Sequence, residues 1–177
     1  MYKNDDDATK ERISRQEEKY RYITINFLTD LFNGKITNIS GTPDNCGVDV
    51  RFTAVTSTAI ETYDVEVKER NKSKTLMERY PTAELKKAKY NSMCSAHTNN
   101  KLIYIQYINE VAYIYDMDKL NWEQVKLEDW NIKYTQYDDT SNIKTTPTYF
   151  IPYTQSLNKI NVSKYYKDYA NNQQRLQ

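Results

Sequence analysis

The residues best suited to chemistry in this sequence are two carboxylates and a lysine. Glu66 and Lys68 lie in the run 63–68, where Tyr and Val residues alternate with charged ones. A period of two is typical of a strand with one apolar and one charged face. The run 48–52 alternates in the same way and carries Asp49 on its polar side. The two runs therefore predict neighbouring strands that present carboxylates on one face.

A short polar connection between these runs predicts a hairpin, although it lacks the Asn-Gly or Asp-Gly pair that favours the tightest turns. If the hairpin is centred between Ser57 and Thr58, Asp49 lies directly opposite Glu66, and such cross-strand neighbours have Cβ atoms about 5 Å apart. Two carboxylates this close repel each other unless a cation or a shared proton lies between them. The arrangement predicts a metal site, with Lys68 as a positive donor on the same face.

The Glu-x-Lys spacing alone is weak evidence, because it occurs at 17–19, at 66–68 and at 84–86. We expect the first and third copies in helices, where residues two apart are rotated by about 200° and point away from each other. In a strand the two side chains share a face. Only the copy at 66–68 is expected both in a strand and opposite an aspartate.

At these residues the sequence resembles the PD-(D/E)XK nuclease superfamily, which includes restriction endonucleases, Holliday-junction resolvases and phage recombination nucleases. The resemblance covers about residues 11–116, and its specific residues are Asp49 and the triplet Glu66-Val67-Lys68. The literal Pro-Asp of the family occurs at Pro43-Asp44, too early for the predicted strand pairing. Asp49 is the preferred ligand because it begins an apolar strand, whereas Asp44, the alternative, lies among loop-forming residues.

The resemblance implies Mg²⁺-dependent hydrolysis of DNA phosphodiester bonds, with Mn²⁺ able to replace Mg²⁺. Asp49, Glu66 and the Val67 carbonyl would hold one or two ions through oxygen ligands, as a hard cation requires. Lys68 would orient the attacking water or neutralise charge at the phosphorus. Resolvase-like members carry a glutamate on the first helix, which implies a catalytic role for Glu17. Restriction, resolvase and recombination activities all remain open.

The charge distribution adds a candidate DNA-binding surface. The net charge of +1 argues against a histone-like binder, yet eight basic residues stand against three acidic ones between positions 68 and 90. Alone, this excess would equally suit a solvated helix face, but beside a nuclease-like motif contact with phosphates is the better interpretation. The predicted DNA-binding residues are Arg70, Lys72, Lys74, Arg79, Lys86, Lys87 and Lys89.

Composition limits the other possibilities. A hydrophobic fraction of 38% and a mean hydropathy of −0.90, without a signal-like N-terminus, predict a soluble cytoplasmic protein. The chain has two cysteines and one histidine, too few for a zinc site built from nitrogen and sulfur, and a His-based nucleophilic triad is equally disfavoured. Any chemistry therefore depends on carboxylates and lysine.

Periodicity and breaker residues predict one α/β domain over 1–177, with a mixed central sheet flanked by helices. The resemblance implies that this sheet is restriction-endonuclease-like. Residues 1–7 are expected to be disordered and 69–73 to form a loop. Strands are expected at 35–39, 102–108, 111–115 and 148–153 in addition to the hairpin above. Helical segments are expected at 8–33, with Gly34 as its C-cap, and at 75–79, 82–95, 122–130 and 161–170.

Two other interpretations compete with an active nuclease. A catalytically inactive descendant would keep the sheet as a DNA-binding or assembly module. An unrelated α/β interaction protein would explain the charged strand by ion pairs of Glu66 with Lys68 or Arg51, and a large separation between Asp49 and Glu66 would favour it. If the protein does cut both strands of DNA with one site per chain, we expect a homodimer with no membrane association.

Overall fold

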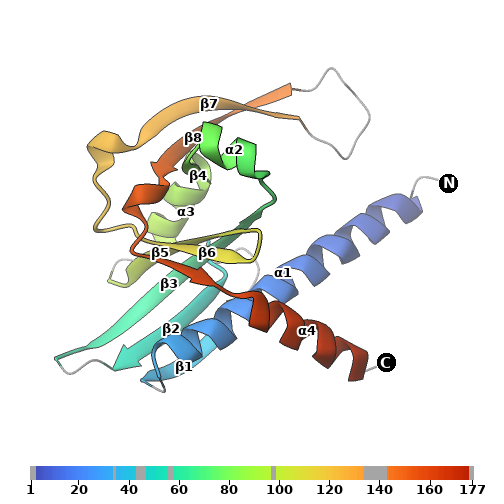
Figure 1. The fold of residues 1–177 in the computed structure, drawn as a ribbon, viewed down its shortest axis with the longest axis vertical. Coiled ribbons are helices and arrows are strands. Elements are labelled where there is room, and N and C mark those ends of the chain that lie inside the picture. Colours follow the sequence, from blue (N-terminus) through green and yellow to red (C-terminus); the bar gives the residue numbers. More distant parts are fainter. Residues whose placement is uncertain are drawn as a thin grey trace.

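A six-stranded mixed sheet forms the centre of the computed structural model, which describes residues 3–33, 35–42, 47–55, 58–96, 99–133 and 143–175 (Figure 1). The strand order is β1-β2-β3-β5-β6-β9. Strands β3 and β5 are parallel and all other neighbours are antiparallel. The strands are β1 (Ile36–Gly41), β2 (Val50–Val55), β3 (Ile60–Arg70), β5 (Lys101–Ile108), β6 (Val111–Asp116) and β9 (Asn158–Asn161). The predicted α/β class with a mixed sheet is confirmed.

A second, three-stranded antiparallel sheet has the order β4-β8-β7. It consists of β4 (Thr82–Lys86), β8 (Ile143–Pro152) and β7 (Lys126–Lys133). The predicted helix over 82–95 is wrong in its first part, because β4 pairs with the end of β8 and the helix α3 occupies only Lys87–Ala96. The predicted helix over 122–130 is likewise wrong, since only a 3₁₀ turn at Trp122–Gln124 precedes β7.

Two helices cover one face of the central sheet. The first, α1 (Lys3–Leu31), begins inside the acidic segment 1–7, and α4 (Ser163–Arg175) lies beside it (Figure 1). Lys164 Nζ and Asp30 Oδ2 form an ion pair of 2.7 Å between these helices, and the rings of Tyr22 and Tyr169 lie 5.3 Å apart. The expected cap Gly34 and the expected turn residue Ser57 lie outside the described residues.

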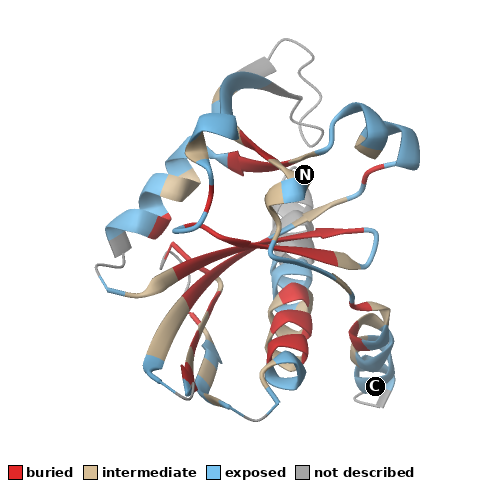
Figure 2. Ribbon diagram, turned by 60° about the vertical axis from the view of Figure 1, so that its left-hand side comes forward, coloured by how far each residue is buried: buried red, intermediate tan, exposed pale blue. Residues whose placement is uncertain are grey.

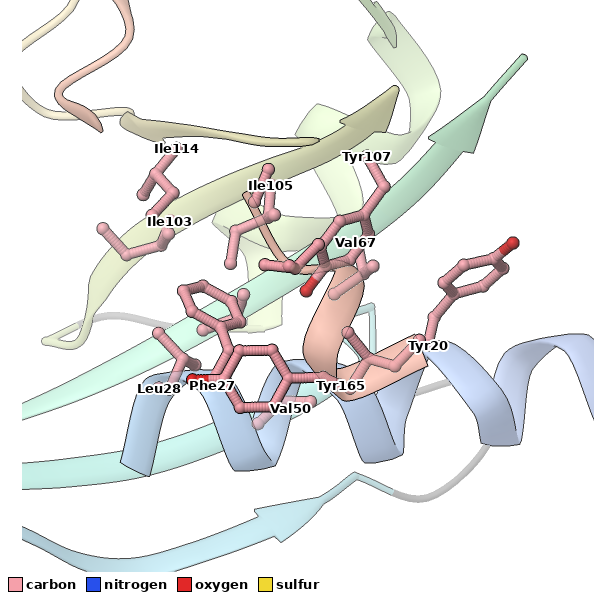
Figure 3. Packing of buried hydrophobic residues seen from close by; sticks show 14 of the residues in the cluster. Tyr20, Phe27, Leu28, Val50, Val67, Ile103, Ile105, Tyr107, Ile114 and Tyr165 are labelled. Atoms are coloured by element: carbon pink, nitrogen blue, oxygen red, sulfur yellow. The ribbon is translucent and has the colours of Figure 1, made fainter. Parts of the chain in front are cut away.

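The larger core lies between these helices and the sheet (Figure 3). Along α1 the buried residues recur at helical spacing, so one stripe of the helix packs on the sheet (Figure 2). The sheet contributes the apolar positions of β2 and β3, which alternate with polar positions as the sequence predicts, and one face of β5, whose other face is largely apolar as well. The buried members include Tyr20, Ile23, Phe27, Leu28, Val50, Phe52, Val65, Val67, Ile105, Tyr107 and Tyr165. This packing fixes the side of α1 that faces β3.

The opposite face of the sheet carries a second core, formed with β4, β8 and α3. Ala83 and Leu85 of β4 and Met93 of α3 are buried there against Tyr104 and Tyr115 of the sheet. The predicted placement of the first helix on one face and of the helix near 90 on the other is therefore confirmed. None of the helices in the described ranges is both long and apolar enough to span a bilayer.

Of the remaining elements, α2 and the hairpin of β5 and β6 follow the predictions closely. In contrast, β9 was not predicted, β8 begins at Ile143 rather than at 148, and α4 begins at Ser163 rather than at 161. Helix α2 spans Lys74–Arg79 and is capped by Ser73, whose side chain accepts a hydrogen bond from the Leu76 amide. The hairpin of β5 and β6 turns at Asn109 and Glu110, which both have positive φ. The expected loop over 69–73 begins only after Arg70, because β3 continues beside β5 as far as Arg70–Ile108.

Candidate active site

The hairpin of β2 and β3 has the register that the sequence predicts. Val50 pairs with Val65 and Arg51 with Asp64, so the position after Val65 lies opposite Asp49. Asp49 precedes β2 and still bonds to β3, because its amide donates to the Val65 carbonyl at 2.8 Å. The Val67 amide in turn donates to Asp49 Oδ2 at 2.8 Å. The Asp49 carboxylate is therefore held against the strand segment that carries Glu66.

A cavity of about 560 Å³ opens between α1, β3 and β4. The four residues with expected catalytic roles, Glu17, Asp49, Glu66 and Lys68, all line it, and Val67 lines it as well. Glu17 of α1 is exposed, and its side chain contributes to the cavity wall and not to the core. The structure thus brings together residues that are up to 51 positions apart in the chain.

Glu66 has the most perturbed electrostatics of the site. Its side chain is 7% exposed, and burial raises its pKa to about 8, with the nearby Asp49 charge as the second cause. Lys89 of α3 acts in the opposite direction, since its Nζ lies 3.0 Å from Glu66 Oε2. That oxygen is buried but accepts no well-aligned hydrogen bond. Among the described residues, the Lys89 ammonium is therefore the charge that faces this buried oxygen.

Lys68 lies at the mouth of the same cavity and remains partly exposed to solvent. Loss of hydration among the cavity walls lowers its pKa, and the Arg70 charge lowers it further, while the Glu66 carboxylate acts in the opposite direction. A lysine with a lowered pKa can exchange a proton more readily than an ordinary one. Its position beside both carboxylates suits contact with an anionic group bound in the cavity.

The ion pairs expected for an unrelated interaction protein are not those observed for Glu66. Arg51 Nε pairs with Asp64 Oδ1 at 2.7 Å, and Glu66 pairs with Lys89 from another element. Asp49 and Glu66 lie close enough for the charge of one to raise the pKa of the other. The large separation that would have favoured that interpretation is therefore absent. Asp44, the alternative ligand, lies outside the described residues.

The predicted DNA-binding residues fall into three groups. Arg70, Lys86 and Lys89 line the cavity, so they could contact a phosphate bound there. Lys74, Arg79 and Lys87 are exposed outside it, and the Lys74 side chain is 91% exposed. Lys72 forms the third group by itself.

The prediction that Lys72 is an exposed phosphate contact is wrong. Its side chain is 6% exposed, and its Nζ bonds to the Glu84 carboxylate, to the Thr82 carbonyl at 2.8 Å and to the Tyr153 hydroxyl at 3.0 Å. The lysine thus joins the loop before α2 to β4 and to the end of β8. Burial with a full set of acceptors makes it a structural cation.

The third Glu-x-Lys copy also lies in a strand, contrary to expectation. Glu84 and Lys86 belong to β4, and both line the cavity. Glu84 is nevertheless engaged within the protein, because it binds Lys72, accepts from Gln106 Nε2 at 3.0 Å and lies 3.6 Å from Arg70 Nε. Its carboxylate therefore positions cations of the wall.

Sequence reasoning missed several residues of the cavity wall, including Arg21, Glu69, Glu84 and Tyr104. Arg21 had a readable signal, since it lies one helical turn after Glu17 and so on the same face of α1. Tyr104 had none, because it reaches the site only through the parallel pairing of β5 with β3, which sets it beside Glu66.

The donor set of the site suits a hard divalent cation. Among the described residues, no group of three or more His, Cys, Asp or Glu side chains is arranged to hold a metal ion. Mg²⁺ is commonly bound by only one or two protein carboxylates, together with water and substrate phosphate. Two adjacent carboxylates, one of them buried, fit that pattern, and the Val67 carbonyl is the third expected ligand.

No protein-family model matches this sequence, and no curated protein shows significant similarity to it. The residues of the site are therefore the basis for assigning a function to this protein.

Proposed function

We propose that this protein is a Mg²⁺-dependent endonuclease that hydrolyses phosphodiester bonds of DNA in the cytoplasm. The observation that carries the proposal is the forced proximity of Asp49 and Glu66 in an open cavity beside Lys68. A buried carboxylate next to a second one is costly unless a cation offsets the charge. Such an arrangement is common where a site is built for function, because stability alone would not favour it.

In this proposal Asp49, Glu66 and the Val67 carbonyl hold the metal ion. When bound, Mg²⁺ would activate water and stabilise charge on the phosphate. The Val67 amide keeps the Asp49 carboxylate oriented, through the hydrogen bond of 2.8 Å. Lys68 orients the attacking water or neutralises charge at the phosphorus. Glu17, on the cavity wall formed by α1, accepts a proton or holds a second water. Lys89, which pairs with Glu66 at 3.0 Å in the metal-free protein, would be available to the substrate phosphate if a cation took its place.

The proposed DNA surface consists of the cavity cations together with Lys74, Arg79 and Lys87. We propose a homodimer, because one active site per chain cuts both strands only when two chains act together. Light scattering with and without duplex DNA tests the dimer, and a monomer at micromolar concentration in both conditions would refute it.

The deciding experiment compares cleavage of linear duplex, single-stranded, flap and four-way-junction DNA in Mg²⁺, in Mn²⁺ and in a chelator. We expect Mg²⁺- and Mn²⁺-dependent cleavage of at least one substrate, lost in Asp49→Asn and in Glu66→Gln. Glu78→Gln is the matched control, because Glu78 is an exposed glutamate of α2 outside the cavity. Asp44→Asn decides between the two candidate aspartates.

The same experiment separates the alternatives. If the wild-type protein binds DNA and Mg²⁺ but cuts none of the four substrates, it is an inactive DNA-binding or assembly module. If Asp49→Asn and Glu66→Gln both cleave as fast as wild type, the nuclease assignment at this site is wrong.

A further inference from the structure

Arg21 of α1 is a cavity cation without a carboxylate partner in the part of the chain that the structure describes. It lines the same cavity as Asp49 and Glu66. Within the described ranges no carboxylate oxygen lies within 4.0 Å of its guanidinium, whereas Arg51, Arg70 and Lys89 each lie within that distance of one. The Arg21 Nε is also buried and finds no hydrogen-bond acceptor among the described residues. A buried donor without an acceptor is costly, so stability alone would not favour this placement of a guanidinium at the wall of an open cavity.

Gly41 leaves the space through which the Arg21 side chain runs. A Cβ atom built on Gly41 would lie 2.2 Å from Arg21 Cδ and 2.9 Å from Arg21 Nε. Gly41 is the last residue of β1 and pairs with Val50 in an ordinary strand conformation. A glycine is therefore required here because the Arg21 side chain approaches closely. The backbone conformation itself would suit any residue.

The backbone and the side-chain stem of Arg21 are both held in place. Its helix is held on the sheet by Tyr20, Ile23 and Thr24, which are buried on either side of it in sequence. Its stem lies against the Gly41 backbone, so the guanidinium has little freedom to turn away. A fixed planar guanidinium matches the oxygens of a phosphate, to which it can donate two parallel hydrogen bonds.

We infer that Arg21 binds a phosphate group of the substrate beside the metal site, and that Gly41 exists to admit its side chain. The inference deepens the proposed function and rests on it for the identity of the substrate. Arg21 touches the bound phosphate, while Gly41 is a positioning residue that acts through Arg21. The two should therefore behave as one unit when they are replaced together.

The test uses inorganic phosphate as the probe, titrated by calorimetry with and without Mg²⁺, so that it does not depend on cleavage. Arg21→Ala should weaken phosphate binding about tenfold or more, as expected for removal of a charge-assisted hydrogen bond. Gly41→Ala should weaken binding to a similar extent, and the double variant should bind no more weakly than Arg21→Ala alone. Lys167→Ala, which removes an exposed cation of α4 outside the cavity, should bind as wild type.

Thermal unfolding provides the second readout. Gly41→Ala should lower the melting temperature in the wild-type background and have little effect in the Arg21→Ala background, where the added methyl group has room. If Gly41→Ala does not fold, the double variant should still fold. A double variant that is as unstable as Gly41→Ala would refute the role of Gly41.

The outcomes also separate this inference from the nuclease proposal. Unchanged phosphate affinity in Arg21→Ala overturns the inference, even if the wild-type protein cleaves DNA. Weakened phosphate binding in Arg21→Ala, in a protein that cleaves none of the DNA substrates, supports the anion site and overturns the nuclease proposal alone.

Discussion

The raised pKa of Glu66 predicts that the metal-free protein loses stability as the pH rises. In the folded protein Glu66 holds its proton up to about pH 8, whereas the ordinary value of 4.5 applies to the unfolded chain. Between these values unfolding releases a proton, so the free energy of unfolding falls with increasing pH. Where unfolding releases one full proton, the free energy of unfolding falls by about 1.4 kcal/mol for each pH unit. From pH 5 to pH 8 the contribution of Glu66 should decrease by about 3 kcal/mol.

Replacing Glu66 with Gln removes this titration while keeping the size of the side chain. We expect urea unfolding in a chelator to show that Glu66→Gln is more stable than wild type by an amount that grows with pH, reaching about 3 kcal/mol more at pH 8 than at pH 5. Comparing the two proteins cancels the other groups that titrate in this range. Adding Mg²⁺ at pH 8 should stabilise wild type and leave Glu66→Gln unchanged.

Two further variants identify the cause of the pH-dependent stability. Asp49→Asn should reduce the pH dependence without abolishing it, because burial is the larger cause of the shift and the Asp49 charge the second. Glu78→Gln, at an exposed position on α2, should follow wild type at every pH. If the stability difference between wild type and Glu66→Gln is the same at pH 5 and pH 8, the view of Glu66 as a buried, charge-crowded carboxylate is refuted.

Three other predictions concern the cations around the site. Lys72→Met should destabilise the protein by about 3–5 kcal/mol in urea unfolding, since it leaves Glu84 in a buried position without its main partner. Adding Glu84→Gln should recover part of the stability. Unchanged stability together with weaker DNA binding would instead show that Lys72 contacts DNA. Replacing both Lys74 and Arg79 by Ala should leave the melting temperature unchanged. The slope of the logarithm of the DNA-binding constant against the logarithm of salt concentration should become shallower by about 0.9 for each phosphate that is no longer neutralised. An unchanged slope would mean that both side chains are solvated and do not contact DNA. Lys68→Ala should abolish cleavage and retain Mg²⁺ binding by calorimetry, and loss of both would contradict a role separate from metal binding.

The local features of the site could be predicted from the sequence because they depend on near neighbours in the chain. Alternation with a period of two predicts both strands of the hairpin, and a short connection leaves few possible registers. The observed pairing of Val50 with Val65 is the predicted one, and it sets Asp49 beside the segment with Glu66. The helical segment expected over 8–33 is equally local, and α1 spans Lys3–Leu31 in the structure.

Tertiary structure decided the rest, because those features depend on partners that are far away in sequence. Residues 82–86 are mostly strong helix formers, and they become a strand because they pair with residues 148–152, far away in the sequence. The same strand brings Glu84 to Lys72, and so buries a lysine that looks solvated in the sequence. Arg21 meets Gly41 only when α1 packs across β1. A side chain's own type determines which chemistry it can perform, but burial and charge neighbours are properties of the assembled fold.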